Sequence, residues 1–315
     1  MLNTSKKAIK TGLSLLLISF FILVTCLYAD LDILFGDIET IFKRPLTLTT
    51  ILFVYFAAFC ARGLAWKLYL KNTPSYMSCI AGIFYSLLLN HLLPFKAGDL
   101  ARIGILKLRE PGISNGQVVN SVVVLRLLDM AILSVIAAIG LVSLHMQFRF
   151  WPLLLFSITT FAFIMAGQKH SKFVKRQVEL MKTGLAGLSG LFVIVLTAGS
   201  WIMEAAVVYG VLTILGEHAS IWEAAWVNSI TVAGQIFQVT PGGIGSYEAV
   251  MIFALGLAGV PVNEAYSAAV MTHSIKFIFS FAAGAFVLAA FPVSFPTIRK
   301  WLQEGREKRE KRVKV

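Results

Sequence analysis

Residues 238–249 read QVTPGGIGSYEA, a glycine-rich break that carries Glu248 inside an otherwise apolar region from about residue 221 to residue 291. In a soluble protein this stretch would be an ordinary loop. In the core of a bilayer, the N–H and C=O groups that a break frees have no solvent partners. Such a break is therefore tolerated only where protein or a water-filled cavity surrounds it. The stretch predicts a functional site inside a membrane-embedded region.

The composition around this stretch is that of a membrane protein. Hydrophobic residues make up 57% of the 315-residue chain and charged residues 14%, with a mean hydropathy of +0.79, whereas soluble domains have about 25% charged residues. Six apolar stretches approach or exceed the ~20 residues that cross a bilayer: 11–29, 47–70, 115–144, 150–167, 186–216 and 262–291. We expect an all-α, polytopic membrane helix bundle, with one integral membrane domain over residues 1–296 and a basic tail over 297–315.

The placement of the basic residues predicts an orientation in the membrane. The formal net charge is +12, and most Lys and Arg residues lie in short segments beside the apolar stretches. This pattern indicates anionic head groups and not nucleic acid as the partner. The loop at 168–182 and the tail after residue 297 are strongly basic, which predicts that both are cytoplasmic, as is the N-terminus. Arg62 and Lys67, near the end of an apolar stretch, are expected to extend to the inner interface as anchors.

Two polar breaks interrupt this simple pattern. With the basic loops on the cytoplasmic side, residues 77–110 begin and end inside, and residues 221–260 begin and end outside. Residues 98–108 are too few to cross the bilayer. Each segment is therefore expected to be a re-entrant hairpin with its Pro/Gly break near the tip.

The two hairpins belong to a predicted internal repeat. At an offset of 147 residues the chain aligns four pairs of positions, which are Pro94 with Pro241, Gly98 with Gly245, Arg126 with His273, and Asp129 with Lys276. The last two pairs place ionisable residues at i and i+3, on one face of a long apolar helix. With halves at about 47–144 and 186–291 in opposite orientation, the pattern is typical of the inverted repeats of transporters, whose sites lie near the midplane. A chance alignment is the alternative, because only two of the four matches are identities.

Three cations at mid-depth are candidates for contact with a phosphate group: Arg126, His273 and Lys276. An isolated charge at the bilayer centre costs at least ~2.5–3.5 kcal/mol, so a partner or a function is expected. The alternative is that Arg126 and Lys276 neutralise buried carboxylates.

The glycine turn and the carboxylates each allow two interpretations. The N–H groups after Pro241 could face an anion at a helix N-terminus, or the glycines could permit close helix packing. Glu248, Asp99 and Glu204 could carry protons, because burial raises the pKa of a carboxyl group. Glu248 and Asp99 could instead cap helix amides.

Four motifs carry a resemblance to a known family. They are NHLLPFKAGDLAR at 90–102, RLLD at 126–129, WIMEAAVVYG at 201–210 and TPGGIGSYEA at 240–249. Over nearly its whole length, the chain resembles the transmembrane, flippase-like domain of lysylphosphatidylglycerol synthases. It departs from the family pattern at Asp99, where a glutamate is usual, at Leu125, and at His273 and Lys276, where an arginine is common. The resemblance implies a stand-alone protein of a bacterial or archaeal cytoplasmic membrane that lacks the soluble synthase domain.

These observations predict translocation of an anionic lipid, either a phospholipid or a polyprenyl-phosphate-linked lipid, between leaflets. The alternatives are a membrane-embedded lipid-modifying enzyme, lysyltransferase-like, or a subunit associated with a separately encoded lipid-modifying enzyme or glycosyltransferase. The sequence has no Gly-Lys-Ser/Thr phosphate loop, Ser/His/Asp set or metal-ligand cluster, so we expect no catalytic residue, cofactor or metal. The predicted head-group-binding residues are Asn90, Pro94, Gly98, Asp99, Arg102, Arg126, Asp129, Glu204, Pro241, Gly242, Gly243, Gly245, Glu248, His273 and Lys276.

Overall fold

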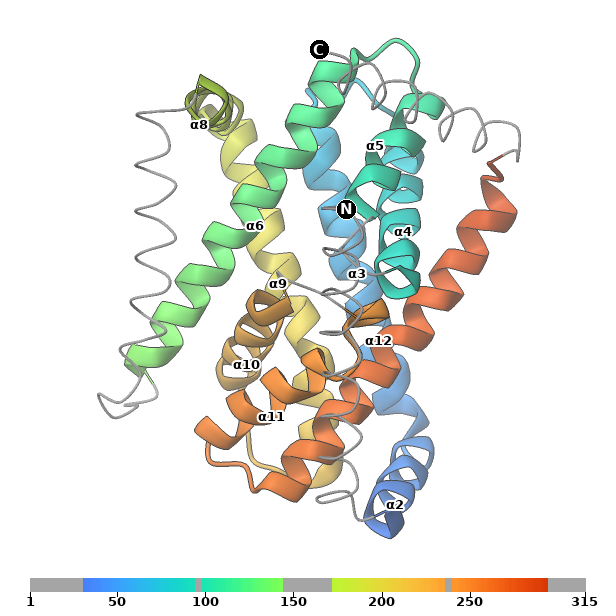
Figure 1. Ribbon diagram of the computed structural model, residues 1–315, viewed down its shortest axis with the longest axis vertical. Coiled ribbons are helices and arrows are strands. Elements are labelled where there is room, and N and C mark those ends of the chain that lie inside the picture. The colour runs from blue at the N-terminus through green and yellow to red at the C-terminus, as the bar shows by residue number, and fades with distance from the viewer. Residues whose placement is uncertain (1–30, 94–97, 144–171, 236–239, 294–315) are drawn as a thin grey trace, which may run out of the picture.

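The computed structural model describes residues 31–93, 98–143, 172–235 and 240–293, and these residues form helices joined by short turns, with no strand among them (Figure 1). The predicted all-α class is therefore confirmed. The helices in chain order are α2 (Leu31–Phe42), α3 (Pro45–Tyr69), α4 (Tyr76–Leu92), α5 (Gly98–Arg109), α6 (Asn115–Ser143), α8 (Lys172–Gly184), α9 (Gly187–Leu215), α10 (Ile221–Gly234), the 3-10 turn η3 (Pro241–Gly243), α11 (Ser246–Leu257) and α12 (Val262–Ala290).

Four of the described helices are long and apolar enough to cross a membrane. They are α3, α6, α9 and α12, and they coincide with four of the six predicted spans. The other two predicted spans, 11–29 and 150–167, lie outside the described residues. The chain is a multi-pass membrane protein.

Local sequence signals explain where several helices begin and end. Pro45 opens α3 at a position where its missing N–H has no helical partner to lose. Gly216 ends α9 with a φ of 85°, a left-handed conformation that glycine adopts without a steric penalty. At the start of α10, the Ser220 N–H donates to Glu223 Oε2 at 2.6 Å and the Glu223 N–H donates to Ser220 Oγ at 3.2 Å. This reciprocal capping box satisfies two amides that the helix itself cannot bond.

The helices pack around an aromatic and aliphatic core. Helix α3 lies along α9, and α12 packs against α4, α9 and α11. The side chains of Tyr55, Trp66 and Phe84 are fully buried. At Gly140 on α6, an added Cβ would lie 2.1 Å from Cδ1 of Trp226 on α10. The absence of a side chain at that position therefore allows α6 and α10 to approach closely.

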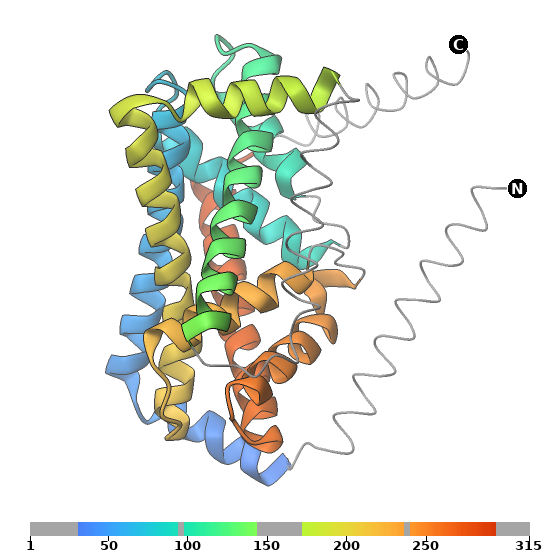
Figure 2. The same cartoon turned by 90° about the vertical axis from the view of Figure 1, so that its left-hand side faces the viewer.

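Two helix pairs enter the bundle from opposite ends (Figures 1 and 2). The pair α4–α5 starts and finishes at the end where α8 lies, and the pair α10–α11 starts and finishes at the end where α2 lies. The η3 turn of the second pair packs on α4. The breaks at 94–97 and 236–239, and with them Pro94, lie outside the described residues. That the pairs are re-entrant stays a prediction, because it depends on where the bilayer lies.

Two pairs of helices match in length between the halves of the predicted repeat, and one of these pairs also matches its period. Helices α6 and α12 have 29 residues each, and their first residues, 115 and 262, lie 147 positions apart. Helices α5 and α11 have 12 residues each. The inversion symmetry that would relate the two halves stays a prediction.

The basic segment at 168–182, predicted as a loop, contains a helix instead. Helix α8 lies across the ends of α6 and α9 (Figure 2). Lys175 and Arg176 are exposed, whereas Gln177 is buried and its Nε2 donates to Oδ1 of Asn120 on α6 at 3.3 Å. The many charges of this segment favoured a loop in the prediction, but they lie on one side of an amphipathic helix. The face without lysines packs on the bundle.

Candidate functional site

A cavity of about 160 Å³ lies where the two hairpins meet the four long helices. The space is large enough for a small polar group. Nine of the fifteen predicted site residues line it: Asn90, Asp99, Arg102, Arg126, Asp129, Glu204, Gly242, His273 and Lys276.

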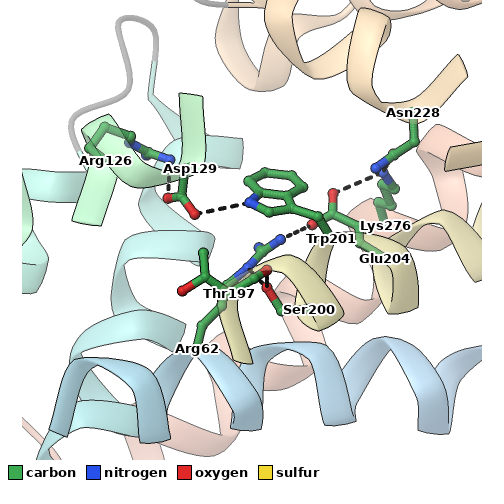
Figure 3. A network of polar contacts seen from close by, with 9 residues as sticks. All are labelled: Arg62, Arg126, Asp129, Thr197, Ser200, Trp201, Glu204, Asn228 and Lys276. Atoms are coloured by element: carbon green, nitrogen blue, oxygen red, sulfur yellow. Dashed lines mark hydrogen bonds and ion pairs between the residues drawn. The ribbon is translucent and has the colours of Figure 1, made fainter. Parts of the chain in front are cut away.

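The carboxylate of Glu204, on α9, lies at the centre of the polar network (Figure 3). Its Oε2 accepts a hydrogen bond from Nη2 of Arg62 at 2.6 Å, and its Oε1 accepts one from Nζ of Lys276 at 3.1 Å. Lys276 Nζ also donates to Asn228 Oδ1 at 2.8 Å. The exposed fractions of the three charged side chains are 8% for Glu204, 16% for Arg62 and 5% for Lys276. One buried carboxylate therefore serves two cations and joins α3, α9 and α12.

The position of Arg62 corrects the prediction that it is an interface anchor. Its guanidinium lies 4.0 Å from the ring centroid of Trp201, and its Nε donates to Ser200 Oγ at 3.1 Å. Arg62 lies seven residues before the end of α3 at Tyr69, which is about 10 Å at 1.5 Å per residue. At that depth a buried carboxylate is a closer partner than the head groups, so the side chain turns inward. The position of Arg62, seven residues before the end of the helix, is the feature of the sequence that could have indicated a buried side chain.

A second network joins α5, α6 and α9. Arg126 donates from Nε to Asp99 Oδ2 and from Nη2 to Asp99 Oδ1, both at 3.1 Å, which is a bidentate pair. Nη1 of Arg126 lies 3.7 Å from Oδ2 of Asp129. Asp129 Oδ1 also accepts the Trp201 indole N–H at 2.9 Å. Arg126 and Lys276, both predicted to contact phosphate, are thus held in ion pairs, as the alternative interpretation expected.

Arg102 differs from the other cations of the cavity. Its guanidinium lies 4.0 Å from the ring centroid of Trp66, whose indole N–H donates to Ser121 Oγ at 2.8 Å. Its Nε is buried without a hydrogen-bond partner, and no described residue forms an ion pair with it. Stacking on an aromatic ring holds the guanidinium without using its N–H groups.

The charges that line the cavity do not balance. Among the described residues that line the cavity, four cations (Arg62, Arg102, Arg126 and Lys276) face three carboxylates (Asp99, Asp129 and Glu204), which leaves one positive charge when the histidines and the nearby Glu248 are uncharged. A low-dielectric surrounding strengthens the field of that charge. The site therefore favours a small anion.

The glycine turn is packed, and the N–H groups of Gly243, Ile244 and Gly245 already have hydrogen-bond acceptors. Gly242, Gly243 and Gly245 have φ values of 64°, 80° and 84°. The N–H of Gly245 donates to Glu248 Oε2 at 2.7 Å, so this carboxylate caps α11 from within its own first turn. An added Cβ at Gly242 would lie 2.1 Å from Cζ of Phe277. Both the capping role of Glu248 and the packing role of the glycines are observed.

Five predicted residues lie beside the cavity without lining it: Gly98, Pro241, Gly243, Gly245 and Glu248. Gly98 opens α5, and its N–H donates to Asn90 Oδ1 at 2.9 Å. Glu248 reaches the cavity wall through His273, whose Nδ1 lies 2.6 Å from Glu248 Oε1. Pro94 lies outside the described residues.

Several cavity residues were missed by sequence reasoning: Tyr55, Phe59, Arg62, His91, Trp201, Gln235 and Tyr247. Trp201 precedes Glu204 by three residues within a motif that was singled out, so helical spacing could have found it. An aromatic residue in an apolar span carries no comparable signal, because most such residues are core or interface residues. Among the described residues, no cluster of three or more His, Cys, Asp or Glu side chains could hold a metal ion.

A membrane-spanning helix bundle with charged side chains around an internal cavity defines a polytopic integral membrane protein. Residues 9–284 match the family model described as the lysylphosphatidylglycerol synthase TM region. The chain belongs to this family, which is related to lipid handling. Comparison with curated proteins and with solved structures found no match.

Proposed function

We propose that this protein translocates an anionic lipid between the leaflets of the membrane, with the lipid's phosphate-bearing head group passing through the cavity and its acyl or prenyl chains remaining in the bilayer. A phospholipid and a polyprenyl-phosphate-linked lipid are the two candidate classes. The supporting observation is the excess of cations over carboxylates among the described residues that line the cavity. Membership of a family related to lipid handling adds to it.

Arg102 is the cation that we assign to first contact with the anion. Arg62, Arg126 and Lys276 already have carboxylate partners, so an arriving phosphate must compete for them. Arg102 needs no ion pair to be broken. A hydrogen bond to a charged group contributes about 1.5–3 kcal/mol, which corresponds to roughly 10- to 100-fold in a rate or an affinity that depends on it.

The test follows a fluorescent lipid in proteoliposomes. A reductant that cannot cross the bilayer destroys the fluorophore in the outer leaflet, so the signal reports how fast labelled lipid reaches that leaflet. The wild-type protein should accelerate transfer of fluorescent phosphatidylglycerol or of a labelled polyprenyl phosphate. Arg102→Gln should slow transfer by about tenfold or more, because it removes the unpaired cation.

Controls separate the cavity from the general surface. Lys175→Gln removes an exposed cation of α8, far from the cavity, and should leave the rate unchanged. Lys276→Met removes a second cation of the cavity. Circular dichroism verifies that each variant is folded. Wild-type rates in both cavity variants would overturn the proposal. Detection of a covalently modified lipid after incubation with the purified chain would instead favour the enzymatic alternative.

A further inference from the structure

His273 has hydrogen-bond acceptors at both nitrogens of its ring. Nδ1 lies 2.6 Å from Oε1 of Glu248, and Nε2 lies 3.1 Å from the carbonyl oxygen of Gly242. A neutral imidazole has a single N–H and can donate only one of these bonds. Both are made at once only when a further proton is present, either on the ring or on the Glu248 carboxyl group.

The second oxygen of Glu248 has its own donor. Oε2 accepts the N–H of Gly245 at 2.7 Å, which holds the carboxyl group in place at the start of α11. The Glu248 and His273 side chains are only 7% and 5% exposed. Without the further proton, a nitrogen lone pair would face an oxygen lone pair, at 2.6 Å or at 3.1 Å. In a buried site, where water cannot readily take over either bond, one of the two contacts must then open.

The titratable and charged groups around His273 come from four helices. Glu248 and Tyr247 face it from α11, and the Tyr247 ring stacks on the imidazole at 4.0 Å. His91 of α4 lies with its ring centroid 6.4 Å away. Lys276 follows one turn later on α12 and is paired with Glu204 of α9. Among these groups, the Glu248 carboxyl is the one in direct hydrogen-bond contact with the ring.

The bond to Gly242 attaches the η3 turn to α12. Gly242 lies in η3 with a φ of 64°, and an added Cβ there would lie 3.0 Å from the carbonyl oxygen of His91 on α4. Gly242 and His273 both line the cavity. Opening of the His273–Gly242 contact would therefore release a wall of the cavity from α12.

We propose that the Glu248–His273 pair is a proton-binding site and that loss of its proton frees the η3 turn from α12, which makes lipid movement proton-linked. One proton leaves the pair for water, and the pair changes from neutral to a charge of −1. The link to lipid movement rests on the proposed function. The proton site itself does not.

The proton site is tested by spectroscopy of the full-length protein in lipid nanodiscs. Nitrogen NMR of ¹⁵N-histidine-labelled protein, assigned by comparison with His273→Gln, distinguishes protonated from bare ring nitrogens. Infrared spectroscopy, with Glu248→Gln as the reference, detects a protonated carboxyl group. The expected result at neutral pH is two protonated nitrogens on His273 or a protonated Glu248. A bare ring nitrogen together with an ionised Glu248 would overturn the proposal.

The link to transport is tested by Glu248→Gln in proteoliposomes with fluorescent phosphatidylglycerol or labelled polyprenyl phosphate at a series of pH values. The glutamine oxygen can accept the Gly245 N–H, and its amide N–H can donate to Nδ1 of His273. The variant therefore keeps both contacts without a titratable proton. Transport by wild type should change by up to about tenfold per pH unit on one side of the titration, since a single proton is involved. Transport by Glu248→Gln should be slow and independent of pH.

Two control variants remove exposed titratable groups elsewhere. His218→Gln and Glu179→Gln should retain the pH dependence of wild type. Lipid movement by wild type that does not vary with pH, or a Glu248→Gln variant with the wild-type pH profile, would overturn the link. If wild type moves no lipid at all, the proposed function fails, and the spectroscopic measurement still decides whether the pair binds a proton.

Discussion

Replacement of Glu204 by glutamine tests whether the central network holds the bundle together. The substitution keeps the shape of the side chain but removes the negative charge that two buried cations share. Arg62 Nη2 lies 2.6 Å from one oxygen and Lys276 Nζ lies 3.1 Å from the other. The variant therefore leaves two buried cations with no carboxylate in contact.

The expected magnitude follows from these distances. With an effective dielectric constant of about 20, the two attractions are roughly 6 and 5 kcal/mol. Desolvation of all three charges offsets much of this in the native protein. Loss of one member of a buried ion pair costs about 3–5 kcal/mol, because the remaining charge stays buried without a partner. We expect Glu204→Gln to lower the free energy of unfolding by about this amount.

The assay is equilibrium unfolding of the purified protein in detergent micelles, followed by circular dichroism. Lys276→Met and the double variant complete a thermodynamic cycle. The double variant should be more stable than the sum of the two single losses predicts, by about 1–3 kcal/mol, because Glu204→Gln leaves Lys276 buried without a carboxylate and the double variant removes that charge as well. As the control, Glu39→Gln breaks the exposed pair that Glu39 forms with Lys43 on α2 at 2.7 Å, and stability should not change measurably.

Two results would refute this reasoning. A loss below about 1 kcal/mol for Glu204→Gln would mean that the network contributes no more than an exposed pair does. Strictly additive losses in the cycle would mean that Glu204 and Lys276 do not depend on each other.

Two further substitutions and one control substitution have defined outcomes, measured by the same unfolding assay. Gly242→Ala should destabilise the protein by more than about 1 kcal/mol, because the residue has a positive φ and the new Cβ would collide with Phe277. Gly256→Ala, in the exposed part of α11 with open space around it, should be neutral or slightly stabilising, and equal effects would contradict the packing argument. Trp201→Phe keeps a ring beside Arg62 but removes the N–H that Asp129 accepts, which should cost about 1–3 kcal/mol. An unchanged stability would show that the indole bond is dispensable.

Much of the fold was predictable because hydrocarbon imposes strict rules on a chain. An apolar stretch of about 20 residues has few options besides a helix, and the predicted spans coincide with α3, α6, α9 and α12 within a few residues. The amphipathic helix α8 was not predicted, because the sign of its charges was used to assign a side of the membrane and their helical period was not considered. The burial of Arg62 in an ion pair was not predicted, because a cation near the end of a span is usually an anchor.

The candidate site was predicted as a set of residues and not as a set of contacts. An ionisable side chain inside an apolar helix is conspicuous, so Arg126, Glu204 and Lys276 could be singled out. Their partners could not be assigned, because a carboxylate such as Asp99 or Glu204 is equally available to any cation at the same depth. The choice depends on which helices are neighbours.

The sequence by itself determined that this protein is a helical membrane protein, where its polar breaks fall, and to which family it belongs. Hydrophobicity and the need to satisfy the backbone act along the chain, so they can be read along the chain. Only the tertiary structure decided that Arg62 and Lys276 share Glu204, that Glu248 caps α11 while it binds His273, and that Arg102 stacks on Trp66 without an ion pair. Those contacts join residues up to 142 positions apart. They exist because helix packing brings the side chains within about 3 Å of one another, and no local pattern encodes that distance.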